Sequence, residues 1–263
     1  MLNQFFHDPL TLGIVQAVIA ALMVLATALL ARQQRVFFIR EISVAMLRGL
    51  VQIVCVGFGL ALLLKVPFWL GAFILLGMAT IAAQMTAQHA KHLPGVFLIS
   101  FIGISLGSGL VIGLMTWLGV IEPTLTSLVP VGSMIISSTM RSNSQALERF
   151  RAEILAHERQ IEAGLALGAT PKQITAPYLQ ATVSASLLPH IDSLQSLGIV
   201  WIPGLMTGMV LSGASPIYAA LYQFVVMALI VAAARITALV TTTLIRDRLF
   251  SPADQLLLHL VER

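Results

Sequence analysis

Apolar residues gather in seven long runs that contain almost no charged side chains. A helix that crosses the roughly 30 Å hydrocarbon core of a bilayer needs about 20 such residues. A segment inside the bilayer must also satisfy its own backbone hydrogen bonds, and no run shows the short alternation of a barrel strand. The pattern predicts an all-α polytopic membrane protein, one domain over residues 1–263, with transmembrane helices over residues 10–31, 42–64, 67–88, 93–119, 124–140, 193–212 and 216–245.

Composition excludes the main alternative, a soluble domain. Hydrophobic residues make up 58% of the chain and charged residues 10%, and the mean hydropathy is +0.94. A soluble protein of 263 residues is far more polar. The single cysteine, Cys55, falls within the second run, and we expect it to be a packed thiol. The net charge of +4 belongs to loops, so the expected surroundings are lipid and not nucleic acid.

The distribution of basic residues predicts the orientation. By the positive-inside rule, loops rich in Lys and Arg lie in the cytoplasm. Loops on one side of the predicted bundle hold only Lys65 and the acidic Glu122. The other side holds Arg32, Arg35, Arg40, Lys91, Arg141, Arg149, Arg151, Arg159, Lys172, Arg246 and Arg248. We therefore expect the N-terminus outside and the C-terminus in the cytoplasm.

Residues 141–190 form the one long polar segment, which we expect in the cytoplasm. Nine Lys, Arg, Asp or Glu residues lie between Arg141 and Gln173. Its apolar residues recur at helical spacing and predict one stripe of a helix: Leu147, Phe150, Ile154, Ile161 and Leu165.

A tight corner between two helices is predicted near the end of this stripe. Gly168 is suited to end the first helix, Thr170 to cap the second, and Pro171 to occupy its first position. Two interpretations stay open. The segment is a solvated amphipathic extension of the fifth span, or it docks a separate motor protein through Glu162, Ala163, Gly164, Gly168, Ala169, Thr170 and Pro171.

Two of the predicted spans contain helix-disturbing residues. The fifth is short and carries Pro123 and Pro130, so it could be broken. The sixth contains Pro203 and Gly204, a pair that bends or unwinds a membrane helix. Such broken helices often line a substrate path in transporters, although a simple packing kink is the alternative.

Other candidate residues of a path or gate are few. We expect Asp192 to cap the sixth span and Arg235, within the seventh, to need a partner or a water-filled cavity. Four methionines could offer thioether ligands to a metal or simply pack: Met134, Met140, Met206 and Met209. Two glycine pairs in the fourth span, Gly103 with Gly107 and Gly109 with Gly113, permit close helix packing within the bundle or across a homodimer.

Several chemistries lack their motifs. The chain has no Gly-x4-Gly-Lys-Ser/Thr loop for nucleotide phosphates, no His-Glu-x-x-His array and no Cys-x-x-Cys pair. We can assemble no converging set of catalytic side chains, so an enzyme is disfavoured. Any ATP and Mg²⁺ would be used by a partner, and no cofactor or metal site of this chain can be named.

Long ungapped segments resemble FetB-type permeases: Ile191–Val200, Pro203–Gly208, Ser212–Pro216 and Tyr222–Gln223. That resemblance implies the permease subunit of an ABC transporter in the bacterial inner membrane, linked to iron export and resistance to peroxide stress, with plant relatives linked to aluminium tolerance. It also implies a homodimer of this chain with two copies of a separate ATPase.

The segment from Glu162 to Gly168 resembles the loop through which importer permeases dock on their ATPases. Gln180 and Ala181 stand where importers carry Leu-Pro, which counts against the importer class but not against docking. The competing hypothesis is a self-sufficient secondary transporter or channel in which Arg235 and Asp192 relay ions.

Overall fold

The computed structural model describes the backbone of residues 9–32, 39–63, 67–251 and 253–257, and their side chains except those of residues 9–10, 28–32, 39–41 and 60–63. Within these ranges the ordered structure is helical, apart from two isolated bridges, Leu197 with Trp201 and Phe250 with Leu256. The chain divides into two compact units, residues 1–66 and residues 67–263. Each unit is described by itself.

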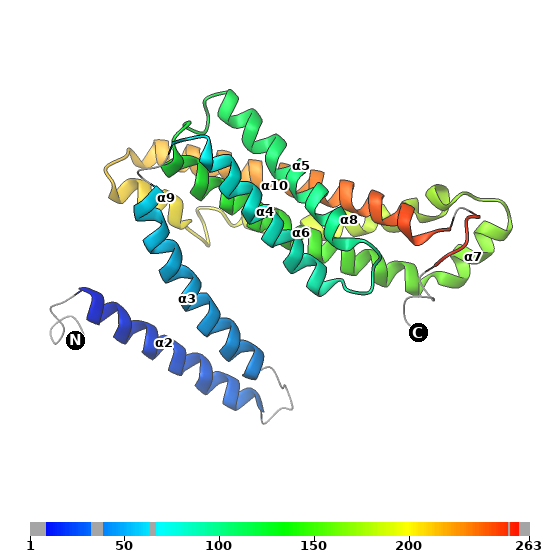
Figure 1. Ribbon diagram of the computed structural model, residues 1–263, viewed down its shortest axis with the longest axis horizontal. Coiled ribbons are helices and arrows are strands. Elements are labelled where there is room, and N and C mark those ends of the chain that lie inside the picture. Colours follow the sequence, from blue (N-terminus) through cyan, green and yellow to red (C-terminus); the bar gives the residue numbers. More distant parts are fainter. Residues whose placement is uncertain (1–8, 33–38, 64–66, 252, 258–263) are drawn as a thin grey trace. The chain divides into compact units, whose positions relative to one another are not determined.

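The N-terminal unit consists of two helices, α2 (Pro9–Arg32) and α3 (Ile39–Leu63), which pack against each other (Figure 1). Their bounds agree with the first two predicted spans within three residues. Cys55 is a free, exposed thiol within this unit, so the expectation of a packed thiol is wrong. Arg35 and Lys65, which contribute to the predicted orientation, lie outside the described residues.

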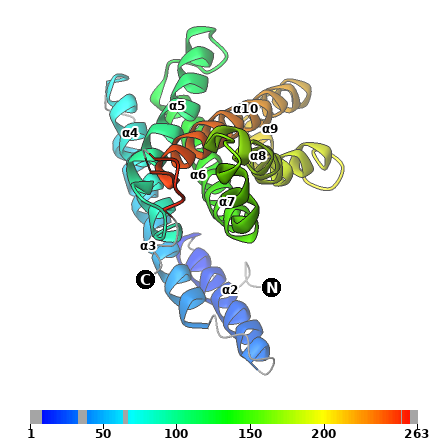
Figure 2. The ribbon, with the colours of Figure 1, turned by 90° about the vertical axis from the view of Figure 1, so that its right-hand side faces the viewer.

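The C-terminal unit is built around four long helices: α4 (Leu70–His89), α5 (Val96–Trp117), α6 (Leu125–Ala156) and α10 (Pro216–Leu249). Helix α10 contacts both α5 and α6, and α4 covers the other side of α5 and α6. Buried aliphatic residues of all four helices form one core cluster. Helix α8 (Pro171–Gln195) lies against α6 and α10, as the two views of the ribbon show (Figures 1 and 2).

Helix α6 corrects two expectations. It runs unbroken through Pro130 and continues to Ala156, well beyond the predicted end of the fifth span at residue 140. The predicted apolar stripe is buried, since Leu147, Phe150, Ile154 and Ile161 are 0% exposed. It is shared by two helices, however, because α6 ends at Ala156 and a separate α7 (Glu158–Ala166) follows.

The sixth predicted span, residues 193–212, is wrong as a single helix. Helix α8 continues to Gln195, an irregular segment follows, and α9 (Gly204–Leu211) is only eight residues long. Pro203 is extended, with ψ of 145°, and directly precedes α9. The expected break at the Pro-Gly pair is therefore misplaced, because α8 has already ended at Gln195 and the pair lies at the start of α9. Asp192 lies inside α8 and caps no N-terminus, because the helix has already begun at Pro171.

In the described part of the chain, four helices are long and apolar enough to cross a membrane: α3, α4, α5 and α10. A shorter apolar stretch, Thr11–Thr27, lies within α2. Helices α6 and α8 are not in this group because they carry more polar and charged residues along their length. The predicted number of seven crossings and the orientation stay predictions.

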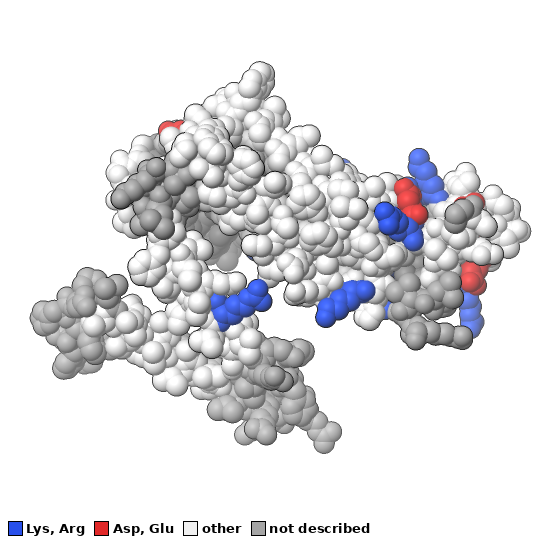
Figure 3. All heavy atoms as spheres, viewed as in Figure 1, with Lys and Arg blue, Asp and Glu red and all other residues white. Residues whose placement is uncertain are grey.

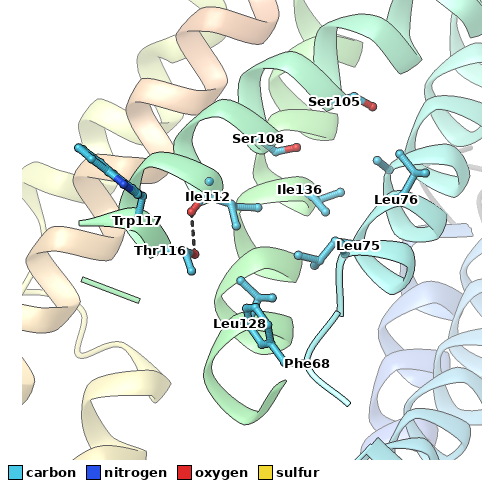
Figure 4. A pocket seen from close by; sticks show the side chains of 14 residues that line it. Phe68, Leu75, Leu76, Ser105, Ser108, Ile112, Thr116, Trp117, Leu128 and Ile136 are labelled. Carbon is cyan, nitrogen blue, oxygen red and sulfur yellow. Dashed lines mark hydrogen bonds between the residues drawn. The ribbon is translucent and has the colours of Figure 1, made fainter. Parts of the chain in front are cut away.

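The two glycine pairs of α5 have different surroundings. A Cβ atom at Gly103 or Gly107 would collide with Thr241 or Thr237 of α10, so this pair packs within the bundle. Gly109 and Gly113 have open space around them. They line an apolar cavity of about 520 Å³ between α4, α5 and α6, whose few polar lining residues include Ser105, Ser108 and Thr116 (Figure 4).

Candidate functional site

The corner between α7 and α8 has the predicted conformation, and its first half is a Schellman motif. Gly168 adopts φ of +90°, a conformation that favours glycine. The backbone N–H of Gly168 donates to the carbonyl of Leu165, and that of Ala169 donates to the carbonyl of Gly164, both at 3.0 Å. These two bonds satisfy the last carbonyls of α7 and fix where it ends.

The second half of the corner is a capping box. The Thr170 side chain accepts from the Gln173 N–H at 3.3 Å, and the Gln173 Oε1 accepts from the Thr170 N–H at 3.0 Å. Pro171 occupies the first turn of α8. The reciprocal bonds satisfy two otherwise unpaired donors, so α8 starts at a defined residue.

The inner face of the corner is tightly packed. Gly164 lets α7 approach α8 closely, since a Cβ atom there would lie 2.5 Å from Cδ1 of Ile174. The His157 and Tyr178 rings stack with centroids 4.6 Å apart, and the Tyr178 hydroxyl donates to the Gln160 side chain at 3.3 Å. These contacts join α7 to the end of α6 and to the first turns of α8.

The outer face of the corner is exposed. Glu162, Ala163, Gly168 and Thr170 are exposed there, and Leu167 is 89% exposed. On the face shown in Figure 3, acidic and basic side chains gather at the α7 end of this unit, and most of the rest of the unit is uncharged. The corner therefore presents an apolar tip in a polar setting.

Two residues of this corner escaped the sequence analysis. Gln173 completes the cap, and the spacing Thr-x-x-Gln of a capping box could have revealed it. Leu167 had no sequence signal, because nothing in its neighbouring residues distinguishes an exposed leucine from a packed one.

The proposed path residues are placed on different helices. Met134 and Met140 lie half-buried on α6, and Met206 and Met209 lie half-buried on α9, next to Pro203 and Gly204. Asp192 is exposed on α8 and Arg235 is exposed on α10. Within the part of the chain that the structure describes, no three His, Cys, Asp or Glu side chains gather in a set that could hold a metal ion.

Asp192 lines a polar cleft between α6 and α8. The cleft has a volume of about 680 Å³, and its other charged residues are Glu148, Arg149 and Glu153. Arg149 lies 4.0 Å from Glu153. Glu148 and Asp192 have no ion-pair partner among the described residues, so the cleft is acidic.

The interface between α6 and α8 also has a polar interior. The Ser142 hydroxyl and Nε2 of His190 form a buried hydrogen bond of 2.6 Å. Asn143 is 0% exposed, and neither atom of its amide has a partner among the described residues. Near Ser142 and His190, α6 and α8 are therefore joined by polar as well as apolar contacts.

An apolar helical bundle with an exposed helical corner is consistent with a polytopic membrane protein. Comparison with known proteins agrees with this class. The family described as "Uncharacterised protein family (UPF0014)" matches residues 14–250, and the chain belongs to this family.

Similar proteins occur in plants and bacteria. The chain is 30% identical to the "UPF0014 membrane protein STAR2" of Oryza sativa over 95% of this chain and 88% of that protein. It is 29% identical to "Protein ALUMINUM SENSITIVE 3" of Arabidopsis thaliana, over 98% and 96%. It is 26% identical to the "Probable iron export permease protein FetB" of Escherichia coli, over 90% and 92%. No solved structure matches the chain.

Proposed function

We propose that this chain is the transmembrane permease subunit of an ABC transporter, driven by a separate ATPase subunit that binds the corner between α7 and α8. The observation that carries the proposal is the construction of the corner. A motif that ends α7 and a motif that begins α8 adjoin at Gly168 and Thr170, with Leu167 and Glu162 exposed on the outside and packed residues inside.

This geometry suits the transmission of force. Helices α6 and α8 both run from the corner into the bundle, and α7 is joined to them by Ile161, Gly164 and the stacked His157 and Tyr178. A displacement of α7 would therefore move α6 and α8 as packed rods, because close-packed elements transmit strain. ATP binding and hydrolysis by the partner would supply the displacement.

The cargo that we propose is iron or a related metal species moving outward. The support is the similarity to the Escherichia coli protein named as a probable iron export permease. We further propose two copies of this chain with two ATPase subunits in the bacterial inner membrane, the N-terminus outside and the corner in the cytoplasm. In this complex ATP and Mg²⁺ belong to the ATPase.

The docking role can be tested by affinity purification from native membranes with mass spectrometry of the co-purified proteins. The unchanged chain should retain an ATPase. Glu162→Arg and Gly168→Leu should lose it while staying in the membrane, the first by reversing an exposed charge and the second by straining the left-handed turn. Lys91→Glu, a charge reversal at an exposed position outside the corner, is the matched control and should retain the ATPase.

The cargo and its direction need a separate measurement. Inside-out vesicles that contain the complex should accumulate ferrous iron when ATP is added, and a hydrolysis-deficient ATPase should abolish the uptake. Transport by the purified chain without any ATPase would instead support the secondary transporter or channel.

A further inference from the structure

Arg235 is a charged residue in the interior of an apolar helix. It lies 19 residues after the start of α10 and 14 before its end, and its side chain is exposed. The large exposed residues Leu221, Phe224 and Leu239, on either side of it along the helix, are apolar. Arg235 has no ion pair or hydrogen bond with any residue that the structure describes. A guanidinium at this depth is costly in lipid, so Arg235 needs a compensating group other than the described residues of its own unit.

The direction of the Arg235 side chain follows from the contacts of its neighbours. Ala234 and Ala238 belong to a cluster with Val183 and Leu187 of α8. On another side of α10, Ala233 and Thr237 face Gly107 of α5. Successive helical residues are 100° apart, so Arg235 lies beyond the contact with α8, on the side away from α5.

The acidic cleft lies on the opposite flank of α8. It is bounded by α6, and Asp192 and Glu148 are its carboxylates without an ion-pair partner. Helices α6, α8 and α10 contact one another in pairs. Helix α8 is thus the apex of a triangle, with the cleft on one flank and Arg235 on the other. The end-on view shows α8 projecting between the other two (Figure 2).

Arg235 and the two carboxylates also lie at similar positions along the axis of the bundle. Ala146, Val183, Leu187 and Ala234 share one cluster, which places Arg235 at their level. Glu148 follows Ala146 by two residues, about 3 Å toward α7, and Asp192 follows Leu187 by five residues, about 8 Å the other way. Arg235 therefore lies at a depth between the two carboxylates.

We propose that two copies of this chain meet along α8, with Arg235 of each copy seated in the acidic cleft of the other. This inference rests on the two-copy complex of the proposed function. A two-fold axis parallel to α8 brings the Arg235 flank of one copy against the cleft flank of the second. Because such a contact is isologous, the pairing of Arg235 with the acidic cleft forms two times, once in each direction. The two uncompensated carboxylates and the uncompensated guanidinium thereby neutralise each other.

The exposed face of α8 fits a helix neighbour better than lipid. Its residues include Ala181, Ser184 and Asp192 beside Leu188, and α8 is not among the described helices that are apolar enough to span a membrane. Small residues on such a face let two helix backbones approach closely.

Cross-linking in native membranes tests whether two copies meet along α8. In a Cys55→Ser background, one tagged copy carries Arg235→Cys and a differently tagged copy carries Asp192→Cys. A bismaleimide that spans an arginine–aspartate pair should join them. Gly109→Cys in place of Arg235→Cys is the control, since Gly109 lies at a similar depth on α5 but on the cavity side. Cross-linking through Gly109 and not through Arg235 would overturn the proposal.

Charge reversal tests the pair itself. Arg235→Glu should weaken self-association about thirtyfold or more, and adding Asp192→Arg should recover much of the loss. Unchanged self-association, or no recovery, would contradict the pairing and favour a lipid phosphate or an anionic cargo as the compensating group. Co-purification of the ATPase is scored in parallel. If the unchanged chain retains the ATPase but the variants do not give the expected cross-linking and self-association, only the proposed interface along α8 is wrong. If the unchanged chain retains no ATPase, the proposed function fails.

Discussion

The hydroxyl of Thr237 donates a hydrogen bond of 3.1 Å to the carbonyl oxygen of Gly103, joining α10 to α5 across 134 residues of sequence. The bond is possible because Gly103 and Gly107 carry no side chain where the two helices cross. In a bilayer, where apolar burial gives little drive for helix association, such close contacts and buried hydrogen bonds hold helices together.

Substitution of Gly107 should therefore destabilise the bundle. A Cβ atom at this position would collide with the Thr237 side chain and would lie 2.7 Å from the backbone oxygen of Ala233, which cannot rotate away. Gly107→Ala should cost about 1–3 kcal/mol, the usual range for overpacking. Thermal unfolding in detergent measures it, with Gly109→Ala as control, because Gly109 faces open space. Equal melting temperatures for the two variants would contradict this packing.

The buried pair of Ser142 and His190 leads to a second prediction. Ser142→Ala leaves the imidazole without its partner in a buried site, which should cost about 1–3 kcal/mol and lower the melting temperature by several degrees. Adding His190→Leu to Ser142→Ala should cost less than the sum of the single changes, since the two groups interact directly. Ser186→Ala is the control, because this buried hydroxyl donates only to a carbonyl of its own helix. Strict additivity would show that the bond contributes nothing.

How far the sequence predicted the structure depends on whether a feature is local. The corner at Gly168, Thr170 and Pro171 was predictable because helix capping involves residues within one turn of each other. The position of the break in the sixth predicted span could not be predicted in this way. Asp192 has the chemistry of a cap, but a polar residue caps only where a helix begins, and α8 had already begun at Pro171.

The candidate path residues show the same limit at the level of packing. Residue chemistry within apolar runs identified Arg235 and the methionines one by one, yet which of them share a surface is set by helix contacts far apart in sequence. The glycine pairs of α5 illustrate this. They have the same spacing, but only Gly103 and Gly107 face α10.

Removal of the α8 cap gives a third prediction. Thr170→Ala deletes the acceptor for the Gln173 amide and should destabilise the first turn of α8 by about 1 kcal/mol. Hydrogen exchange of amides near Gln173 should then be about fivefold faster, the factor that corresponds to this energy. Thr124→Ala is the matched control, because Thr124 precedes α6 without a side-chain capping bond. Unchanged exchange near Gln173 would show that the capping box does not hold the corner.

The exposed Leu167 carries the last prediction, which concerns the ATPase. A leucine that is 89% exposed contributes little to the fold, but its complete burial in a partner is worth about 1.5–3 kcal/mol. Leu167→Ala should therefore weaken binding of the purified ATPase to the permease in lipid nanodiscs about tenfold, without changing the melting temperature. Lys172→Ala, a change at an exposed position in the first turn of α8, should have a much smaller effect at physiological salt. If Leu167→Ala binds the ATPase as tightly as the unchanged chain, the contact depends on the backbone and charges of the corner, and the apolar tip has no part in docking.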